Sequence, residues 1–224
     1  MDPNFDIAKV KLSTHVNYRC TLCGDCCRHV EGSVVMESLD VFRLARYFRE
    51  NGQPARTMEE VLNTYTEPFL LSEELAYPIF ALKTVGPDQS CVFLKDNRCS
   101  IQAAKPRTCR LYPFTVDYAP DTGKFIYYVC REKPHHFAGG DTLVNDWMHE
   151  TFTKEDREYV RLDFEQSKRL GLLMRRVKHL GEQAVLTPLV HYKFCRFNLD
   201  KPFFSQYRQN NKQLLRDLEN MARC

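Results

Sequence analysis

The sequence Cys20-Thr-Leu-Cys23-Gly-Asp-Cys26-Cys27 places four thiols within eight residues. In a chain without a secretory leader, thiols packed this densely ligate metal more often than they pair as disulfides. A Cys-x-x-Cys turn directs two sulfurs at one ion, and Gly24 suits the tight turn that such a site needs. Cys26 extends the turn toward the wrapped geometry of an iron–sulfur cluster. The stretch therefore predicts a metal site and leaves the metal open.

A second, looser group of cysteines follows in the middle of the chain. Sixty-three residues separate its first member from the end of the opening group. Closing a loop of this length costs little more than closing a shorter one, whereas a structural metal site contributes on the order of 10 kcal/mol. We therefore expect the two groups to meet, as two four-thiolate sites or as one cluster with structural cysteines left over. The eight candidate metal ligands are Cys20, Cys23, Cys26, Cys27, Cys91, Cys99, Cys109 and Cys130.

The adjacent pair Cys26 and Cys27 bears on this division. Neighbouring side chains in an extended or turn backbone are expected to diverge, so both sulfurs rarely reach one small ion. We assign the two residues to different centres, or to different irons of one cluster.

The remaining cysteines and the histidines near the thiols are weaker candidates. Cys195 and Cys224 have no partner at a metal-site spacing, and we expect a buried small side chain and an exposed tail thiol. His29 is expected to face solvent or to be hydrogen-bonded. His135 and His136 follow Cys130 and could serve a labile metal or a proton transfer.

Arginines lie beside many of the cysteines. A nearby guanidinium lowers the pKa of a thiol and stabilises an anionic metal centre, so these arginines are expected to serve the thiolates. The alternative is a solvated basic face. The arginines next to a cysteine are Arg19, Arg28, Arg98, Arg110, Arg131, Arg196 and Arg223.

Composition limits the classes of protein that the chain can belong to. Its 224 residues suffice for one well-cored domain, and 43% apolar residues give no sign of disorder. No apolar run approaches the ~20 residues of a membrane span, so no membrane association is expected. The charge of +3, without a basic run carrying interleaved aromatics, predicts no nucleic-acid partner. The N-terminal residues lack the pattern of a signal peptide, which predicts a cytoplasmic protein.

The first half of the chain alternates short helical and strand-like segments. A helix is expected from Ser38 or Asp40 to Glu50, and the capping box at Thr57–Glu60 predicts a second. Further expected elements are a short strand over residues 8–12, strands over 79–85 and 91–94, a helical turn over 102–104, and a β-hairpin joining 114–118 to 124–130.

The second half reads as helical from Asp141 onward. Thr153 and Asp156 begin a segment with charges at i, i+4 spacing that is expected to run past Leu170. Residues 186–194 are expected to form one strand, and residues 210–221 a terminal amphipathic helix. The fold class predicted is α+β. A small, irregular, metal-nucleated domain with short helices and a β-hairpin occupies residues 1–138, and a helical region occupies residues 139–224.

The cysteine motifs, taken in order, resemble a known family. The stretch Cys-x-x-Cys-x-x-Cys-Cys-Arg is followed by Cys91-Val-Phe-Leu, Cys99-Ser-Ile and Lys-Pro-Arg107-x-Cys109-Arg110-x-Tyr-Pro113-Phe114. Together they are similar to the YkgJ-type CxxCxxCC cysteine-cluster proteins, a bacterial group described as zinc- or iron-chelating and often labelled iron–sulfur oxidoreductases. The resemblance covers roughly residues 18–132 and implies that the eight cysteines are metal ligands. It implies no particular reaction.

Three functions follow from these patterns. We prefer an iron–sulfur protein, with a [4Fe–4S] cluster and a redox or cluster-dependent role, on the ferredoxin-like spacing of Cys20, Cys23 and Cys26. The first alternative is a zinc-stabilised structural or interaction module. The second is a protein lysine N-methyltransferase that depends on an iron–sulfur cluster and S-adenosylmethionine, suggested by a distant likeness to flagellin lysine N-methylase. Metal ions, and a protein redox partner or protein substrate, are the expected partners. No catalytic residue is identified, and whether the protein is an enzyme is left open.

Overall fold

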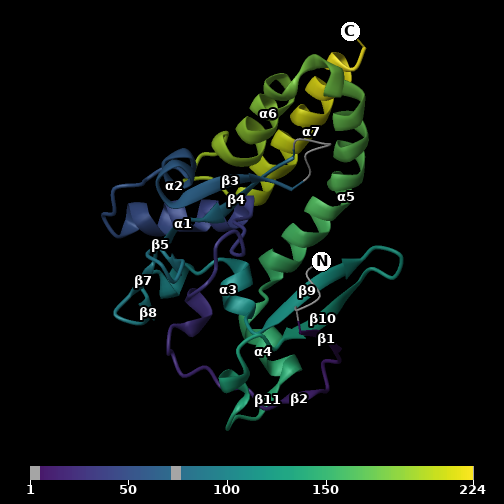
Figure 1. Cartoon of the computed structure of the whole chain (residues 1–224). Coiled ribbons are helices and arrows are strands. Elements are labelled where there is room, and N and C mark those ends of the chain that lie inside the picture. Colours follow the sequence, from purple (N-terminus) through teal and green to yellow (C-terminus); the bar gives the residue numbers. More distant parts are fainter. Residues whose placement is uncertain (1–5, 72–76, 224) are drawn as a thin grey trace. The chain divides into compact units, whose positions relative to one another are not determined.

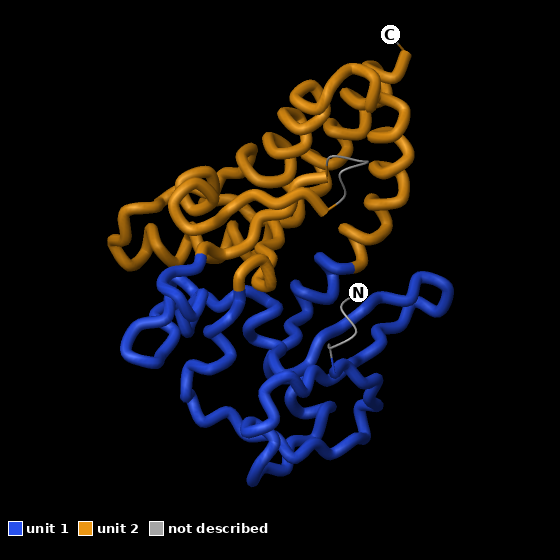
Figure 2. Tube along the Cα trace, in the orientation of Figure 1, with its two compact units in different colours: residues 1–30, 84–160 blue, residues 31–83, 161–224 orange. Residues whose placement is uncertain are grey.

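The computed structural model describes residues 6–71 and 77–223 (Figure 1). It has the predicted α+β fold, with short antiparallel strand pairs and a helical C-terminal region. Each of its two compact units is built from two stretches of chain: unit 1 from residues 1–30 and 84–160, unit 2 from residues 31–83 and 161–224 (Figure 2). These units have other boundaries than the division at residue 138, which stays a prediction.

An antiparallel sheet of three strands supports unit 1. Strand β10 (Lys124–Cys130) lies between β1 (Ile7–Val10) and β9 (Phe114–Ala119). The predicted hairpin and the predicted N-terminal strand are thus confirmed, and Gly123 supplies the positive φ of 65° that the hairpin turn requires. The register pairs Ile7 with Cys130, so the central strand ends at a candidate metal ligand.

Helix α4 (Val144–Thr151) supplies much of the remaining apolar surface of unit 1. Tyr18 packs edge-to-face on Trp147 at 5.4 Å, and the Trp147 Nε1–H donates to the Leu111 carbonyl at 3.0 Å, at the end of α3 (Arg107–Leu111). This core fixes the chain just before Cys20. Its buried residues are Val16, Tyr18, Leu111, Phe114, Val116, Val129, Val144, Met148 and Phe152.

The other elements of unit 1 are very short. They are the paired strands β2 (His15–Val16) and β11 (Thr142–Leu143), β5 (Thr84–Val85) and β6 (Ser90–Cys91), and β7 (Leu94–Lys95) and β8 (Arg98–Cys99), with the helical turns η1 (Asp25–Cys27), η2 (Gln102–Ala104) and η3 (Pro134–Phe137). The turn at residues 102–104 is confirmed. The strand expected over 91–94 is wrong, because the chain turns at Val92 and Phe93 between β6 and β7.

Unit 2 begins with two helices and a strand pair. Helix α1 (Ser38–Glu50) is confirmed, and helix α2 (Met58–Tyr65) begins at the predicted capping box of Thr57 and Glu60. Strand β3 (Thr66–Leu70), which the sequence analysis did not identify, pairs with β4 (Pro78–Leu82). The expected strand over 79–85 is therefore interrupted at Lys83, where unit 2 gives way to β5 of unit 1.

Long helices complete unit 2. Helix α5 (Lys154–Val177) begins in unit 1 with the Thr153 and Asp156 side chains as its cap, and passes through Gly171 without a break. The turn η4 (Lys178–Leu180), helix α6 (Glu182–Val190), the π-helical segment η5 (His191–Cys195) and helix α7 (Phe203–Met221) follow. The predicted terminal helix is confirmed, but it already begins at Phe203. No helix within the described ranges is both long and apolar enough to cross a membrane.

The strand expected over residues 186–194 is wrong, because the whole segment is helical in α6 and η5. A short apolar run does not distinguish a strand from a buried helix by periodicity alone. Val185 and Leu189 are four residues apart, and both side chains are buried in the apolar core of unit 2. Residues at this spacing share one face of a helix, so their burial stabilises the helical conformation. That core comprises Leu170, Leu173, Met174, Val177, Val185, Leu189, Leu214 and Leu218.

Unit 2 also contains an ion pair between a buried lysine and a partly exposed aspartate. The Lys193 ammonium, 4% exposed, donates to Asp163 Oδ1 at 2.5 Å and to the Tyr207 hydroxyl at 2.9 Å. Burial lowers the pKa of Lys193, but the Asp163 carboxylate more than reverses this, so that the pKa is raised and the lysine stays charged.

Candidate metal centre

The turn that carries the first four cysteines contacts Asp88, which precedes β6, and Asn97, which lies between β7 and β8. Gly24 has a φ of +83°, and a Cβ atom at this position would lie 2.6 Å from the Asn97 carbonyl oxygen. The Arg28 guanidinium donates to Asp88 Oδ2 and to Asn97 Oδ1, each at 2.5 Å, and the His29 amide donates to the Asp88 carbonyl at 2.9 Å. These contacts join the segment of the first cysteine group to the segment of the second. In the sequence the two segments are separated by residues 31–83, which belong to unit 2.

Five thiols from both groups are gathered in one electrostatic environment. Burial is the first cause that raises the pKa of Cys91, Cys99 and Cys109, and the neighbouring thiolates raise each of them further. Thiols that disfavour one another's ionisation are relieved by a bound cation. The five, called the thiol group below, are Cys26, Cys27, Cys91, Cys99 and Cys109.

Backbone amides repeat one contact at three of the eight cysteines. Cys91 accepts a hydrogen bond from the Phe93 amide, Cys99 from the Ile101 amide and Cys130 from the Glu132 amide. In each case the donor lies two residues beyond the sulfur and offsets part of the rise in pKa that burial causes. Because the Phe93 amide turns toward sulfur, it explains why the chain bends between β6 and β7. The amides are oriented to stabilise thiolates.

Cys26 and Cys27 do not diverge as expected, because their Sγ atoms lie 4.0 Å apart. The helical turn η1 aligns the two adjacent side chains. The hydrogen bond from Cys27 lowers the pKa of Cys26 to about 6, whereas the same contact raises the pKa of Cys27. Four sulfurs placed tetrahedrally at ~2.3 Å from one ion are separated by about 3.8 Å. The two sulfurs therefore have the separation of ligands to one ion.

Five of the cysteines, two of them outside the thiol group, line a pocket of about 220 Å³ in unit 1. Two tyrosines on the pocket wall have raised pKa values, and burial is the first cause for both. The thiolates of Cys20 and Cys26 raise the pKa of Tyr18 further. Those of Cys26 and Cys130 raise the pKa of Tyr112 further. Both phenols are therefore neutral donors beside sulfur. The cysteines that line the pocket are Cys20, Cys23, Cys26, Cys27 and Cys99.

The cation that acts on the thiol group is Lys105. After the hydrogen bond from Cys27, Lys105 also lowers the pKa of Cys26, and it offsets part of the rise in pKa that burial causes at Cys99 and Cys109. Two of the arginines expected to serve the thiolates bind carboxylates instead: Arg28 binds Asp88, and Arg110 donates to both oxygens of the buried Asp156 at 2.8 Å. For these two residues the sequence-based interpretation is wrong. Being next to a cysteine in the chain does not bring a long side chain to its sulfur.

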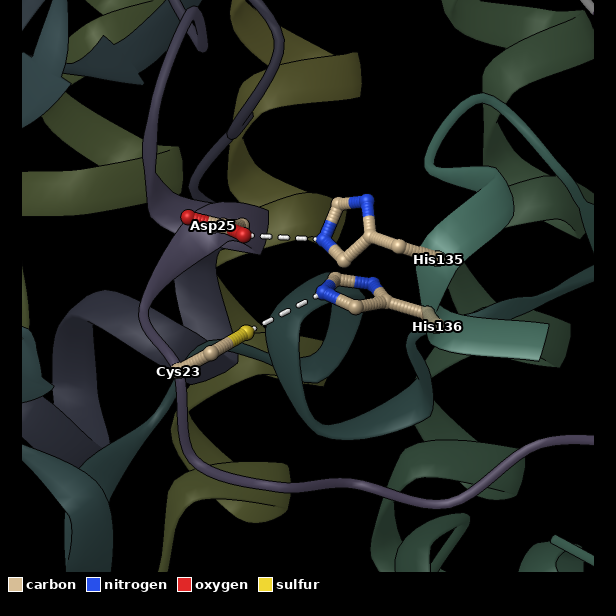
Figure 3. Close-up of side chains that lie close together, drawn as sticks. All are labelled: Cys23, Asp25, His135 and His136. Carbon is tan, nitrogen blue, oxygen red and sulfur yellow. Dashed lines mark hydrogen bonds and ion pairs between the residues drawn. The ribbon is translucent and has the colours of Figure 1, made fainter. Parts of the chain in front are cut away.

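A mixed group of possible ligands lies close together (Figure 3), and two of its members, Cys23 and His136, line the pocket. It consists of Cys23, Asp25, His135 and His136, whose ligand atoms all lie within 4.8 Å of one another. Burial is the first cause that lowers the pKa of His136, and a lowered pKa favours the neutral imidazole that a metal binds.

Comparison with known proteins identifies the family. A model of the CxxCxxCC family, described as "Putative zinc- or iron-chelating domain", matches residues 19–138, more than half of the chain. The chain belongs to the CxxCxxCC family. No curated protein and no solved structure is significantly similar to it. The match covers all eight candidate cysteines, and it supports metal binding without choosing between zinc and iron.

The two cysteines outside the CxxCxxCC match lie apart from the motif. Cys195 is half-buried at the end of η5 in unit 2, where burial raises the pKa of its thiol. Cys195 is thus only partly buried, whereas the sequence predicted a buried small side chain. Cys224 lies outside the described residues. Every cysteine in the described part of the chain is a free thiol.

Three residues that lie close to the candidate ligands were not identified from the sequence. Asp25, Lys105 and Tyr112 lie within a few residues of the cysteines, but no spacing rule marks them. A signal was present for the histidine pair, since His135-His136 follows Cys130 closely. Its partners could not be predicted, because Cys23 and Asp25 lie more than a hundred residues earlier in the chain.

Proposed function

We propose that unit 1 holds an iron–sulfur cluster of the [4Fe–4S] kind through its cysteine thiolates and uses it in a redox or cluster-dependent role. The observation that carries this proposal is the thiol group, in which five sulfurs from distant segments share one environment. A tetrahedral ion takes four ligands, so five gathered thiols, with further cysteines on the pocket, exceed the needs of a single zinc ion.

The donor set suits such a centre. Fe–S clusters are held by Cys thiolates, and hydrogen bonds to their sulfurs tune the reduction potential. The amides of Phe93, Ile101 and Glu132 are donors of this kind. When bound, a cluster would supply one-electron transfer. Candidate ligands are the thiol group together with Cys20, Cys23 and Cys130.

The surroundings of the thiols contribute orientation and charge. Lys105 offsets part of the negative charge that several thiolates bring together. The neutral hydroxyls of Tyr18 and Tyr112 face the pocket as donors. A reducing compartment, which we take to be the cytoplasm, would keep the thiols available, and a protein redox partner or protein substrate would meet the open pocket.

Zinc is the alternative that a specific observation favours. The Cys26 and Cys27 sulfurs, 4.0 Å apart, suit two ligands of one tetrahedral ion. In that case unit 1 would be a zinc-stabilised structural or interaction module.

Metal and sulfide analysis of protein purified without air distinguishes the two. We expect iron and acid-labile sulfide in equal amounts, with the broad visible absorption of a cluster. Replacing Cys99→Ser should remove most of both, whereas Cys195→Ser, a control in unit 2, should leave them unchanged. Protein that holds about two zinc ions and neither iron nor sulfide would overturn the iron–sulfur proposal.

A further inference from the structure

We propose that Cys23, Asp25, His135 and His136 form a second site, which binds one divalent transition-metal ion separately from the thiol group. This reassigns Cys23, which was counted above among the candidate cluster ligands. The five members of the thiol group are left unchanged, so the two proposals can fail independently.

The ligand atoms already converge in the structure. Figure 3 shows the Cys23 sulfur facing the His136 ring and the Asp25 carboxylate facing the His135 ring. Cys23 Sγ lies 3.2 Å from His136 Nε2, and Asp25 Oδ2 lies 2.8 Å from His135 Nε2. Ligands to one tetrahedral ion with bonds of ~2.0–2.3 Å lie about 3.3–3.8 Å apart. Small side-chain adjustments therefore suffice to hold an ion.

Two short turns of the backbone supply the ligands. Cys23 and Asp25 flank Gly24, whose positive φ and close approach to the Asn97 carbonyl hold the turn in place. His135 and His136 lie side by side in η3, with ring centroids 4.3 Å apart. Because each pair is fixed by its own backbone, little conformational freedom would be lost on binding.

Tyr112 orients the buried histidine. Its hydroxyl lies 2.8 Å from His136 Nδ1, and the His136 residue is only 8% exposed. Metal-binding histidines generally donate their other ring N–H to a partner, which fixes the tautomer. With Nδ1 held by Tyr112, Nε2 is the atom that faces Cys23 and the ion.

The charges and donor types define the class of ion. One thiolate and one carboxylate carry two negative charges, and the two neutral imidazoles add none, so the charge of a divalent cation is balanced. A balanced charge lowers the energetic cost of binding the ion in a half-buried site. Imidazole and thiolate suit Zn²⁺, Co²⁺ and Fe²⁺, whereas Ca²⁺ and Mg²⁺ prefer oxygen ligands.

A plain hydrogen-bonded His–Asp pair is the competing explanation, and unit 1 contains one for comparison. His15 Nδ1 lies 2.7 Å from Asp141 Oδ1, with side chains 61% and 73% exposed. The structure gives this pair neither a thiol nor a second imidazole, and it forms no part of the mixed group. It supplies the matched control.

The test is a Zn²⁺ titration against a competing chromophoric chelator, on protein purified without air. Wild type should bind one zinc ion beyond the metal held by the thiol group. His135→Ala and His136→Ala should lose this ion, while His15→Ala should bind it like wild type. Tyr112→Phe should weaken the binding about tenfold. Co²⁺ in the same site should give a thiolate-to-cobalt absorption that is absent in Cys23→Ser.

The outcomes separate the two proposals. Iron, sulfide or zinc held by the thiol group should be equal in wild type and the histidine variants, which also checks that these variants fold. Equal zinc binding by wild type, His135→Ala and His136→Ala would overturn the second site. It would also be overturned if His15→Ala lost the additional zinc ion to the same extent as those two variants. A wild type without iron and sulfide would overturn only the iron–sulfur proposal.

Discussion

The thiol-bearing segments of unit 1 and the helical core of unit 2 hold their backbones by different means. Around the thiols the strands β5 to β8 are each two residues long, and Phe93 and Ile101 are among the few large buried side chains. In unit 2, α5, α6 and α7 bury a set of leucines and valines together with Met174. Strand pairs this short are not stable by themselves.

The difference implies two sources of stability in one chain. Unit 2 is stabilised mainly by apolar burial, at about 25 cal/mol per Å². The thiol-bearing segments gather five sulfurs, and burial keeps the pKa of Cys91, Cys99 and Cys109 raised until a bound cation favours their thiolates and links the segments. Metal should therefore control one region and leave the other largely unaffected.

Removing the metal should produce the largest contrast. A chelator under reducing conditions should cost the thiol-bearing segments on the order of 10 kcal/mol of stabilisation. In hydrogen–deuterium exchange, residues 20–30 and 88–105 should lose amide protection, while α1 and α7 keep theirs. Restoring the metal should restore the protection. Unchanged protection in the stripped wild type would contradict the contrast.

Breaking the ion pair of Lys193 and Asp163 should disturb unit 2 alone. Lys193→Met leaves the Asp163 carboxylate and the Tyr207 hydroxyl without their cation, and should lower the free energy of unfolding by about 3 kcal/mol. Denaturant unfolding, with metal content measured in parallel, checks this. Lys212→Met, on the exposed side of α7, is the control and should change little.

The pH dependence of this difference follows from the raised pKa of Lys193. A group whose pKa is raised by folding stabilises fully below its unfolded pKa, about 10.4 for lysine, and loses that contribution as the pH rises through its folded pKa. The difference between wild type and Lys193→Met should stay constant from neutral pH to about pH 10 and shrink above it. A difference that already falls below pH 8 would refute the ion-pair account.

A pair of glycine substitutions should produce the smallest effect and sharpen the comparison within unit 1. Gly24 and Gly123 both have positive φ, but a Cβ atom would meet the Asn97 carbonyl at 2.6 Å only at Gly24. Gly123→Ala should cost about 1 kcal/mol and keep its metal. Gly24→Ala should cost about 2 kcal/mol and lose metal. Thermal unfolding and metal analysis measure both, and equal behaviour of the two variants would show that the contact with Asn97 is unimportant.

Local sequence patterns predicted elements whose causes are local. The capping box of Thr57 and Glu60, the apolar spacing of α1 and the turn of the β9–β10 hairpin each act within a few residues. Residues 186–194 failed as a prediction because the run is short and apolar, and only its partners in the core of unit 2 select a helix. The split of residues 91–94 likewise depends on an amide that turns to the Cys91 sulfur.

The predictions for the metal centre succeeded where their causes are local in the sequence and failed where distant residues decide. Cysteine spacing identified a metal-binding chain and its candidate ligands, since close thiols have few other uses in a reducing environment. The expectation for Cys26 and Cys27 failed because it assumed that neighbouring side chains diverge in an extended or turn backbone, whereas the helical turn η1 places the two sulfurs close together. The arginine expectation failed for Arg28 and Arg110 because carboxylates compete for a guanidinium in three dimensions.

By itself, the sequence determined that this chain is α+β and binds metal through cysteine, because caps, turns and thiol spacing act over a few residues. Only the tertiary structure decided which sulfurs gather, that Lys105 is the cation beside them, and that His135 and His136 meet Cys23 and Asp25. Those meetings depend on contacts between distant segments, such as Gly24 against Asn97 and Arg28 against Asp88. No local pattern encodes such contacts, since their energy arises only when the chain has folded.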